Sequence, residues 1–281
     1  MRTQTKTGHQ HRTAFTLLEL LIVIVIISIL AGLLFVAFGN TMGNVRVSQT
    51  KAEFAQMEVA MKSFETEYGV IPPSSIVLTE DPGATSWTPS ARSTLRRMFG
   101  ANVDFTQVVD FNKDGDTTDV LTLTSSECLV FFLGGMPDGP DGNTLTGFSR
   151  NQEKPFARLG SNRVDPQYTF DVSRLIDADD DGMREYRDLQ DEGDIAIIYA
   201  SSNNGQGYSK ANGAVAHYYQ SDGATPWKQN SFQLISPGTD GEFGFEPEPN
   251  PFVGPTWSQG SPVPVAGRDN ITNFAPGILG N

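Results

Sequence analysis

Residues 14–38 read AFTLLELLIVIVIISILAGLLFVAF, an almost unbroken apolar run that begins at Phe15 and contains one carboxylate, Glu19. About 20 consecutive apolar residues are enough for a helix to cross a bilayer. A carboxylate inside such a segment is costly unless it has a partner, so we expect Glu19 to have a specific role. The sequence therefore predicts a membrane-spanning helix over residues 15–38.

The residues before this run form a basic leader, residues 1–14, which contains Arg2, Lys6 and Arg12 and no acidic residue. The whole chain has 281 residues and a net charge of −13, so its acidity lies after the leader. A basic flank favours the cytoplasmic side of a membrane. We expect a single-pass protein of the inner (cytoplasmic) membrane, with a cytoplasmic N-terminus and an exported acidic body.

The boundary between Ala14 and Phe15 is the expected processing site. The apolar run is longer than that of a secretory signal peptide, and no small-residue cleavage site follows it. Cleavage before Phe15 would free a charged amine, which the Glu19 carboxylate of a neighbouring helix can neutralise where the dielectric is low. A plain signal anchor with an incidental acid is the alternative.

The sequence from Ala14 to Leu20 resembles the prepilin-type cleavage and methylation motif of type IV pilins and type II secretion pseudopilins. The resemblance implies cleavage before Phe15 by a prepilin peptidase, N-methylation of the new terminus, and a role for Glu19 in filament assembly. Two features depart from the family pattern. Ala14 stands where glycine is usual, and no proline occurs in the second half of the span, near Val36.

Helical spacing continues past the apolar run, over residues 39–69. One apolar stripe recurs at intervals of three, four or seven residues: Val47, Phe54, Met57, Met61, Phe64 and Tyr68. Gly69 and Pro72-Pro73 end the helix, in a way that also resembles major pseudopilins. An amphipathic helix packs one face on a core, so we expect residues 39–69 to cover a globular head at residues 70–245.

The head has the pattern of an α+β fold. Short helices are predicted at residues 89–99 and 125–133, each followed by glycine. Strands of an antiparallel sheet are predicted at residues 168–172, 194–200, 214–219 and 231–236. Residues 74–190 are otherwise interpreted as irregular, and residues 246–281 as an extended Pro-rich tail. The family resemblance implies a pilin-like fold, in which a long N-terminal helix packs on a C-terminal antiparallel sheet with long loops.

Residues 177–188 read DADDDGMREYRD, with acidic side chains at loop positions 1, 3, 5, 9 and 12 and glycine at position 6. This is the spacing of an EF-hand-type calcium loop, in which the position-7 carbonyl is also a ligand. The expected ligands are Asp177, Asp179, Asp181, Met183 through its carbonyl, Glu185 and Asp188. The alternative is a solvated acidic turn.

Residues 110–119 read DFNKDGDTTD and begin in the same way, but position 12 is Leu121. The candidate calcium ligands are Asp110, Asn112, Asp114, Asp116 and Asp119. An Asn- and Asp-rich turn is the alternative.

Asp240 is a third candidate. Residues 236–242 resemble the loop of major pseudopilins in which calcium holds the C-terminal segment, and the resemblance implies Asp240 as the ligand. A Gly-Thr-Asp-Gly turn is the alternative. Calcium, in a structural role, is therefore the expected cofactor.

The composition argues against other functions. The acidic charge disfavours nucleic acid as a partner. A single cysteine, Cys128, excludes an intramolecular disulfide, and it is expected to be a buried small residue. The histidines are His9, His11 and His217, too few in the body for a multi-His metal site. No G-x-S-x-G, phosphate loop or His/Cys nucleophile pair is present, so we expect no enzymatic activity.

We therefore expect a structural subunit of a type II secretion pseudopilus or a type IV pilus-like filament, with its head in the periplasm or on a cell-surface filament. The resemblance implies other pilin or pseudopilin subunits in a homo-oligomeric filament, a prepilin peptidase, a motor, an inner-membrane assembly platform and membrane lipid as partners. Two alternatives remain: a calcium-dependent adhesin or minor tip subunit displayed on a pilin stalk, and a signal-anchored hydrolase.

Overall fold

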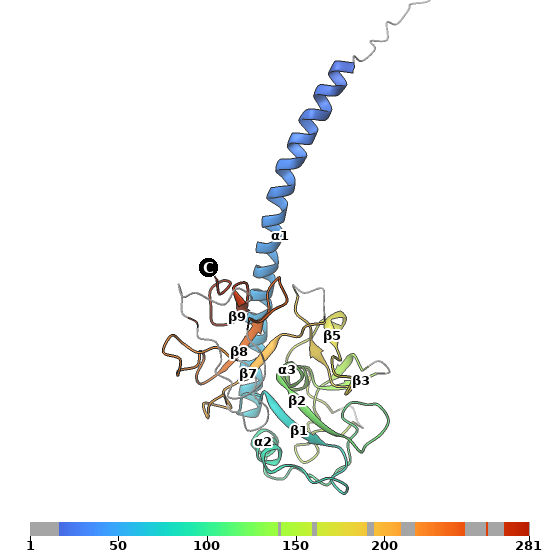
Figure 1. Ribbon diagram of the computed structural model, residues 1–281. Coiled ribbons are helices and arrows are strands. Elements are labelled where there is room, and N and C mark those ends of the chain that lie inside the picture. The colour runs from blue at the N-terminus through green and yellow to red at the C-terminus, as the bar shows by residue number, and fades with distance from the viewer. Residues whose placement is uncertain are drawn as a thin grey trace, which may run out of the picture. The chain divides into compact units, whose positions relative to one another are not determined.

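The computed structural model describes residues 17–139, 142–158, 162–189, 194–208, 217–244, 257 and 267–280; for residues 33–44 it describes the backbone alone. The chain divides into two units, Met1–Val45 and Arg46–Asn281. The first contains the N-terminal part of helix α1, and the second contains the remaining elements (Figure 1).

Helix α1 runs over Leu17–Tyr68, in agreement with the predicted helical pattern. In the first unit the large apolar side chains of residues 17–30 are exposed, with Leu17 at 86% and Leu30 at 54%. Within the described residues, no helix combines the length and the hydropathy that a membrane span requires. The expected span at residues 15–38 includes residues 15–16 and the side chains of residues 33–38, which lie outside the described part.

The later part of α1 belongs to the second unit and carries the predicted apolar stripe. Phe54, Met57, Met61 and Phe64 are all at most 1% exposed, which confirms that this stripe faces a core. Full burial of such a side chain contributes about 1.5–3 kcal/mol. Gly69, at a positive φ of 72°, ends the helix as expected.

An antiparallel pair of strands that sequence reasoning missed contributes to the core. Strand β1 (Ser75–Thr79) pairs antiparallel with β2 (Val120–Thr124). Their inward side chains are Ile76, Leu78, Leu121 and Leu123. The expectation of irregular structure over residues 74–190 is therefore wrong here, because 40 residues separate two short strands whose pairing is not a local property.

The two predicted short helices are confirmed. Helix α2 (Pro89–Phe99) is capped by the Thr88 hydroxyl, which accepts from Ala91 N at 3.2 Å, and it ends at Gly100. Helix α3 (Ser125–Gly134) begins with a capping box between Thr124 and Glu127 and ends at Gly135.

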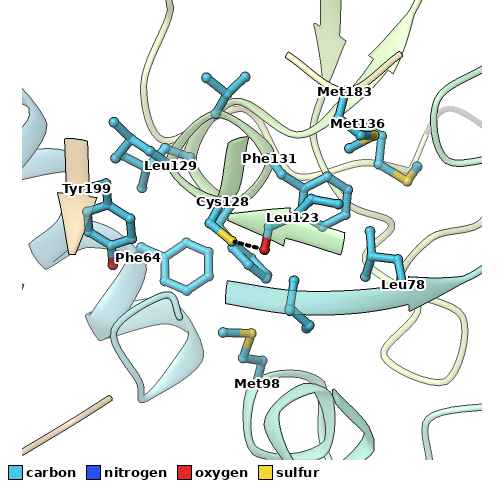
Figure 2. Close-up of a cluster of buried hydrophobic side chains, with 14 of the residues drawn as sticks. Phe64, Leu78, Met98, Leu123, Cys128, Leu129, Phe131, Met136, Met183 and Tyr199 are labelled. Atoms are coloured by element: carbon cyan, nitrogen blue, oxygen red, sulfur yellow. Dashed lines mark hydrogen bonds between the residues drawn. The ribbon is translucent and has the colours of Figure 1, made fainter. Parts of the chain in front are cut away.

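Helix α3 runs through the middle of the core of the second unit (Figure 2). Cys128 is fully buried as expected, and its thiol lies 3.4 Å from the Leu123 carbonyl, to which it donates. Burial raises the pKa of this thiol well above its ordinary value. Backbone N–H groups of Tyr186 and Tyr199 donate to Ser126 Oγ at 2.9 Å and Ser125 Oγ at 3.0 Å, which fixes the start of α3 against two other strands.

The largest sheet in the described residues contains β7 (Ile198–Ser201), β8 (Phe232–Ser236) and β9 (Ile271–Thr272), in that order and antiparallel. Strand β8 confirms the prediction at residues 231–236, and β7 covers the second half of the one at residues 194–200. Strand β9 lies in the segment interpreted as a tail and was not predicted. Asn273 Nδ2 donates to Glu58 Oε1 of α1 at 2.9 Å, so the sheet contacts the later part of that helix (Figure 1).

Two predicted strands differ in the structure. Residues 168–172 form no strand: irregular backbone leads into the 3₁₀ helix η1 (Val172–Arg174), which Asp171 caps by accepting from Ser173 N at 3.0 Å. For the strand at residues 214–219, residues 214–216 lie outside the described part, and Tyr219 forms an isolated bridge with Pro226.

Two small hairpins complete the described elements. Strands β3 (Met136–Asp138) and β4 (Thr144–Thr146) form one, and β5 (Leu175–Ile176) and β6 (Glu185–Tyr186) form the other. The chain is thus α+β, with an N-terminal helix and small antiparallel sheets, and the β5–β6 hairpin carries the main acidic loop.

Candidate metal centre

The predicted processing residues, Ala14 and Phe15, lie outside the described part of the chain. Glu19 lies in the first turn of α1 and is exposed. An acid in the first turn is favoured by the helix dipole. The structure therefore places Glu19 among exposed apolar side chains of the first unit.

The loop between β5 and β6 is held by its own carboxylates. Three of them accept backbone N–H groups of the loop: Asp177 Oδ2 from Gly182 at 3.1 Å, Asp181 Oδ1 from Met183 at 2.8 Å, and Glu185 Oε2 from Ala178 at 3.1 Å. Arg184 Nη1 pairs with Asp177 Oδ2 at 2.9 Å. Gly182 has a φ of 85°, which explains the predicted need for glycine at position 6 of the loop.

Five carboxylates gather at this loop in two overlapping groups. In each group, one oxygen from every residue lies within 4.8 Å of the others. The first group is Asp177, Asp179 and Asp181, and the second is Glu127, Asp179 and Glu185. Asp179 belongs to both groups and so joins them. Among the predicted loop ligands, Asp188 is buried and belongs to neither group.

Glu127 comes from helix α3 and was missed by sequence reasoning. It occupies position N3, where Thr124 N donates to its Oε2 at 2.8 Å. An acid three residues after Thr124 is normally explained by this capping role alone, so the sequence carries no separate signal for a ligand. Its side chain is only 4% exposed.

Burial makes the negative charge of the cluster unfavourable. Burial, together with the nearby charges of Asp181, Glu185 and Asp179, raises the pKa of Glu127 to about 8. Burial likewise raises the pKa of Glu185 to about 7 and raises that of Asp181. Each shift means that the ionised carboxylate is less stable in the fold than in water.

A second acidic group lies at the loop of residues 110–119. It contains Asp116 and Asp119, as predicted, and also Glu80, which follows β1 and was not predicted. Glu80 is fully buried; its Oε1 accepts from Phe111 N at 2.6 Å and its Oε2 from Asp119 N at 3.3 Å. Both oxygens of this buried acid are therefore satisfied by backbone donors.

The other candidates at this loop serve as turn caps. Asp110 Oδ1 accepts from Lys113 N at 2.5 Å, and Asp114 Oδ1 accepts from Asp116 N at 2.8 Å. These are the short-range bonds of an Asx-rich turn, which was the alternative interpretation.

The two acidic loops meet in space. Asn112 Nδ2 donates to the Asp181 carbonyl at 2.9 Å, and a Cβ at Gly182 would lie 2.8 Å from Asn112 Cβ. Glycine at position 182 is therefore required by close approach as well as by its backbone angle. The sequence could not indicate this contact, because the two loops are about 70 residues apart and each one is held by its own internal hydrogen bonds.

Asp240 lies in an exposed turn and belongs to no carboxylate group among the described residues. Its Oδ1 accepts from Glu242 N at 2.8 Å, and its N–H donates to Asp269 Oδ2 at 3.1 Å. The bond to Asp269 joins the turn to the segment before β9.

Comparison with known proteins locates one similarity, at the N-terminus. Neither the curated proteins nor the solved structures contain a match to this chain. A family model matches residues 10–35, a stretch that includes Ala14, Phe15 and Glu19. The chain thus carries the prokaryotic N-terminal methylation motif, which is the prepilin-type cleavage and methylation signal of type IV pilins and pseudopilins.

Proposed function

We propose that this protein is a structural subunit of a pseudopilus or a type IV pilus-like filament, which is cleaved between Ala14 and Phe15 and anchored in the membrane by the start of α1. The methylation motif at residues 10–35 is the observation that carries the proposal. A pilin-like fold is part of it, and the α+β architecture with α1 at the N-terminus agrees with such a fold.

The apolar surface of the first unit supports this role. Along residues 17–30 of α1, large apolar side chains are exposed in succession, among them Ile24 at 54% and Ile26 at 51%. Exposed apolar surface of this extent requires a covering partner, either lipid or other helices of the same kind. A subunit that is stored in the membrane and then assembles into a filament is covered first by lipid and then by the helices of other subunits.

Glu19 has a defined task in such a filament. Cleavage would create a positively charged amine on Phe15, one helical turn before Glu19. In a bundle of apolar helices, neither charge is well solvated, and pairing the carboxylate of one subunit with the amine of the next removes both penalties. Glu19 would therefore select the register in which a new subunit joins.

Intact-mass spectrometry tests the processing. Protein purified from cells that contain a prepilin peptidase should have the mass of a chain that begins at Phe15 and carries one added methyl group. Ala14→Gly should be processed at least as well, because it restores the residue usual in the family. A chain that still begins at Met1, or one that begins after residue 38, would contradict the proposal.

Glu19→Ala should be cleaved normally but should reduce the yield of sheared filaments by at least about tenfold, because losing about 1.4 kcal/mol per added subunit raises the concentration needed for assembly by the same factor. The matched control is Glu67→Ala, because Glu67 is an exposed acid on the same helix. Electron microscopy and the sheared fraction measure the yield. Equal yields from both variants would rule out the role assigned to Glu19.

A further inference from the structure

Five carboxylates surround the β5–β6 loop, and what they bind does not depend on the proposed filament role. They come from two elements: Glu127 from α3, and Asp177, Asp179, Asp181 and Glu185 from the hairpin loop and β6. Arg184 pairs with Asp177 at 2.9 Å, but one guanidinium does not balance five carboxylates. The cluster therefore has the charge of a cation site.

Buried oxygens in the cluster lack hydrogen bonds. Glu127 is 96% buried, at 4% exposure, and its Oε1 makes no hydrogen bond with the described residues. Asp177 Oδ1 is also a buried atom that makes no hydrogen bond with the described residues. A buried carboxylate oxygen without a donor is costly, and such oxygens are rare in folded proteins. Because the other oxygens of these two residues do accept hydrogen bonds, both side chains are held in place with one oxygen left over.

The Glu80 group shows what a fully satisfied buried acid looks like in this protein. Both Glu80 oxygens accept backbone N–H groups, at 2.6 Å and 3.3 Å. The same explanation does not apply to Glu127, because its Oε1 has no such donor. Of the two acidic groups, the one at Glu127 therefore has a buried carboxylate oxygen without a donor, which favours a bound cation there.

We propose that Glu127, Asp179 and Glu185 bind one calcium ion, with Asp177 and Asp181 adding negative charge beside it. Two oxygens bound to the same Ca²⁺ at about 2.3–2.6 Å lie at most about 5 Å apart. The oxygens of each group lie within 4.8 Å of one another, which fits that limit. Three carboxylates also exceed the one or two that Mg²⁺ usually takes, and an all-oxygen set does not suit the softer transition metals.

The ion would connect parts of the second unit that are distant in sequence. Glu127 fixes the start of α3, and the loop ligands belong to the β5–β6 hairpin. Through the Asn112–Asp181 hydrogen bond, the same ion also stabilises the contact with the loop of residues 110–119. Calcium here would act as a cross-link between α3 and two loops.

Calcium titration of the full chain, purified in detergent and freed of metal by chelation, tests the proposal. Isothermal calorimetry with CaCl₂ up to about 10 mM, above the weak end of protein sites near about 10⁻³ M, should show saturable binding. At saturation the midpoint of thermal unfolding should rise by about 5–10 °C. No binding over this range would overturn the proposal, and equal affinity for MgCl₂ would overturn the assignment of calcium.

Matched variants locate the ion. Glu127→Gln keeps an oxygen for the Thr124 cap but removes one charge, so calcium affinity should fall by at least about tenfold. Asp179→Asn, at an exposed position that tolerates substitution, should have a similar effect. Asp222→Asn is the control, because Asp222 is an exposed acid in another loop that belongs to no acidic group among the described residues, so affinity should stay unchanged. Loss of binding in Asp222→Asn with retention in the other two would overturn the site.

Discussion

Replacing Phe64 with alanine should lower the free energy of unfolding by about 3–5 kcal/mol. Phe64 is fully buried on the later part of α1, with its ring centroid 4.4 Å from that of Tyr68 and 6.0 Å from that of Phe132 in α3. The substitution removes an aromatic side chain from the contact between two helices and leaves a cavity. Guanidinium denaturation of the full chain, followed by tryptophan fluorescence, measures the loss as a lower midpoint.

The matched control is Val59→Ala on the same helix. Val59 is 69% exposed, so its truncation should change the free energy of unfolding by no more than about 0.5 kcal/mol. If both substitutions had the same small effect, the later part of α1 would not be packed on the core of the second unit. That result would contradict the fold described above.

Replacing Arg174 with methionine should cost about 3–5 kcal/mol of stability. Arg174 is 7% exposed and pairs with Glu53 of α1 at 2.6 Å. Tyr186 joins the network, since its hydroxyl donates to Glu53 Oε1 at 2.8 Å and its ring lies 4.1 Å from the guanidinium carbon. Without the arginine, the carboxylate of Glu53 stays buried without a counter-ion, and this accounts for most of the loss.

A double replacement separates that penalty from the value of the pair. Arg174→Met combined with Glu53→Met should be more stable than Arg174→Met alone, because no buried charge remains. Lys62→Met is the surface control: Lys62 pairs with Glu65 but is 71% exposed, so its loss should cost less than about 1 kcal/mol. Strictly additive effects in the double variant would show that Arg174 and Glu53 do not interact.

Local sequence signals predicted the helices well. The apolar stripe of α1 and the glycines that follow α2 and α3 are properties of neighbouring residues. Strand β8 was predicted because Phe232, Leu234 and Ile235 lie in a short run bounded by turn residues. The run at residues 168–172 looked similar, but the Asp171 side chain caps a 3₁₀ turn there and removes the strand.

Long-range pairing accounts for what the sequence could not predict. Strand β1 finds its partner across the whole of α2, and β9 has only two residues, so neither has a distinctive local pattern. The acidic loop was predicted from its spacing. The approach of Glu127 to that loop depends on where α3 packs, and a helix cap gives no indication of it.

The C-terminal segment has a consequence for how the chain tolerates shortening. Strand β9 covers one side of β8, and Lys51 Nζ of α1 donates to the carbonyls of Thr272 and Ala275. Proteolytic trimming that removed residues 267–280 would leave β8 with an open row of unpaired N–H and C=O groups. Such an edge recruits strands from other molecules, so the trimmed protein would be prone to aggregate even though most of its core is intact.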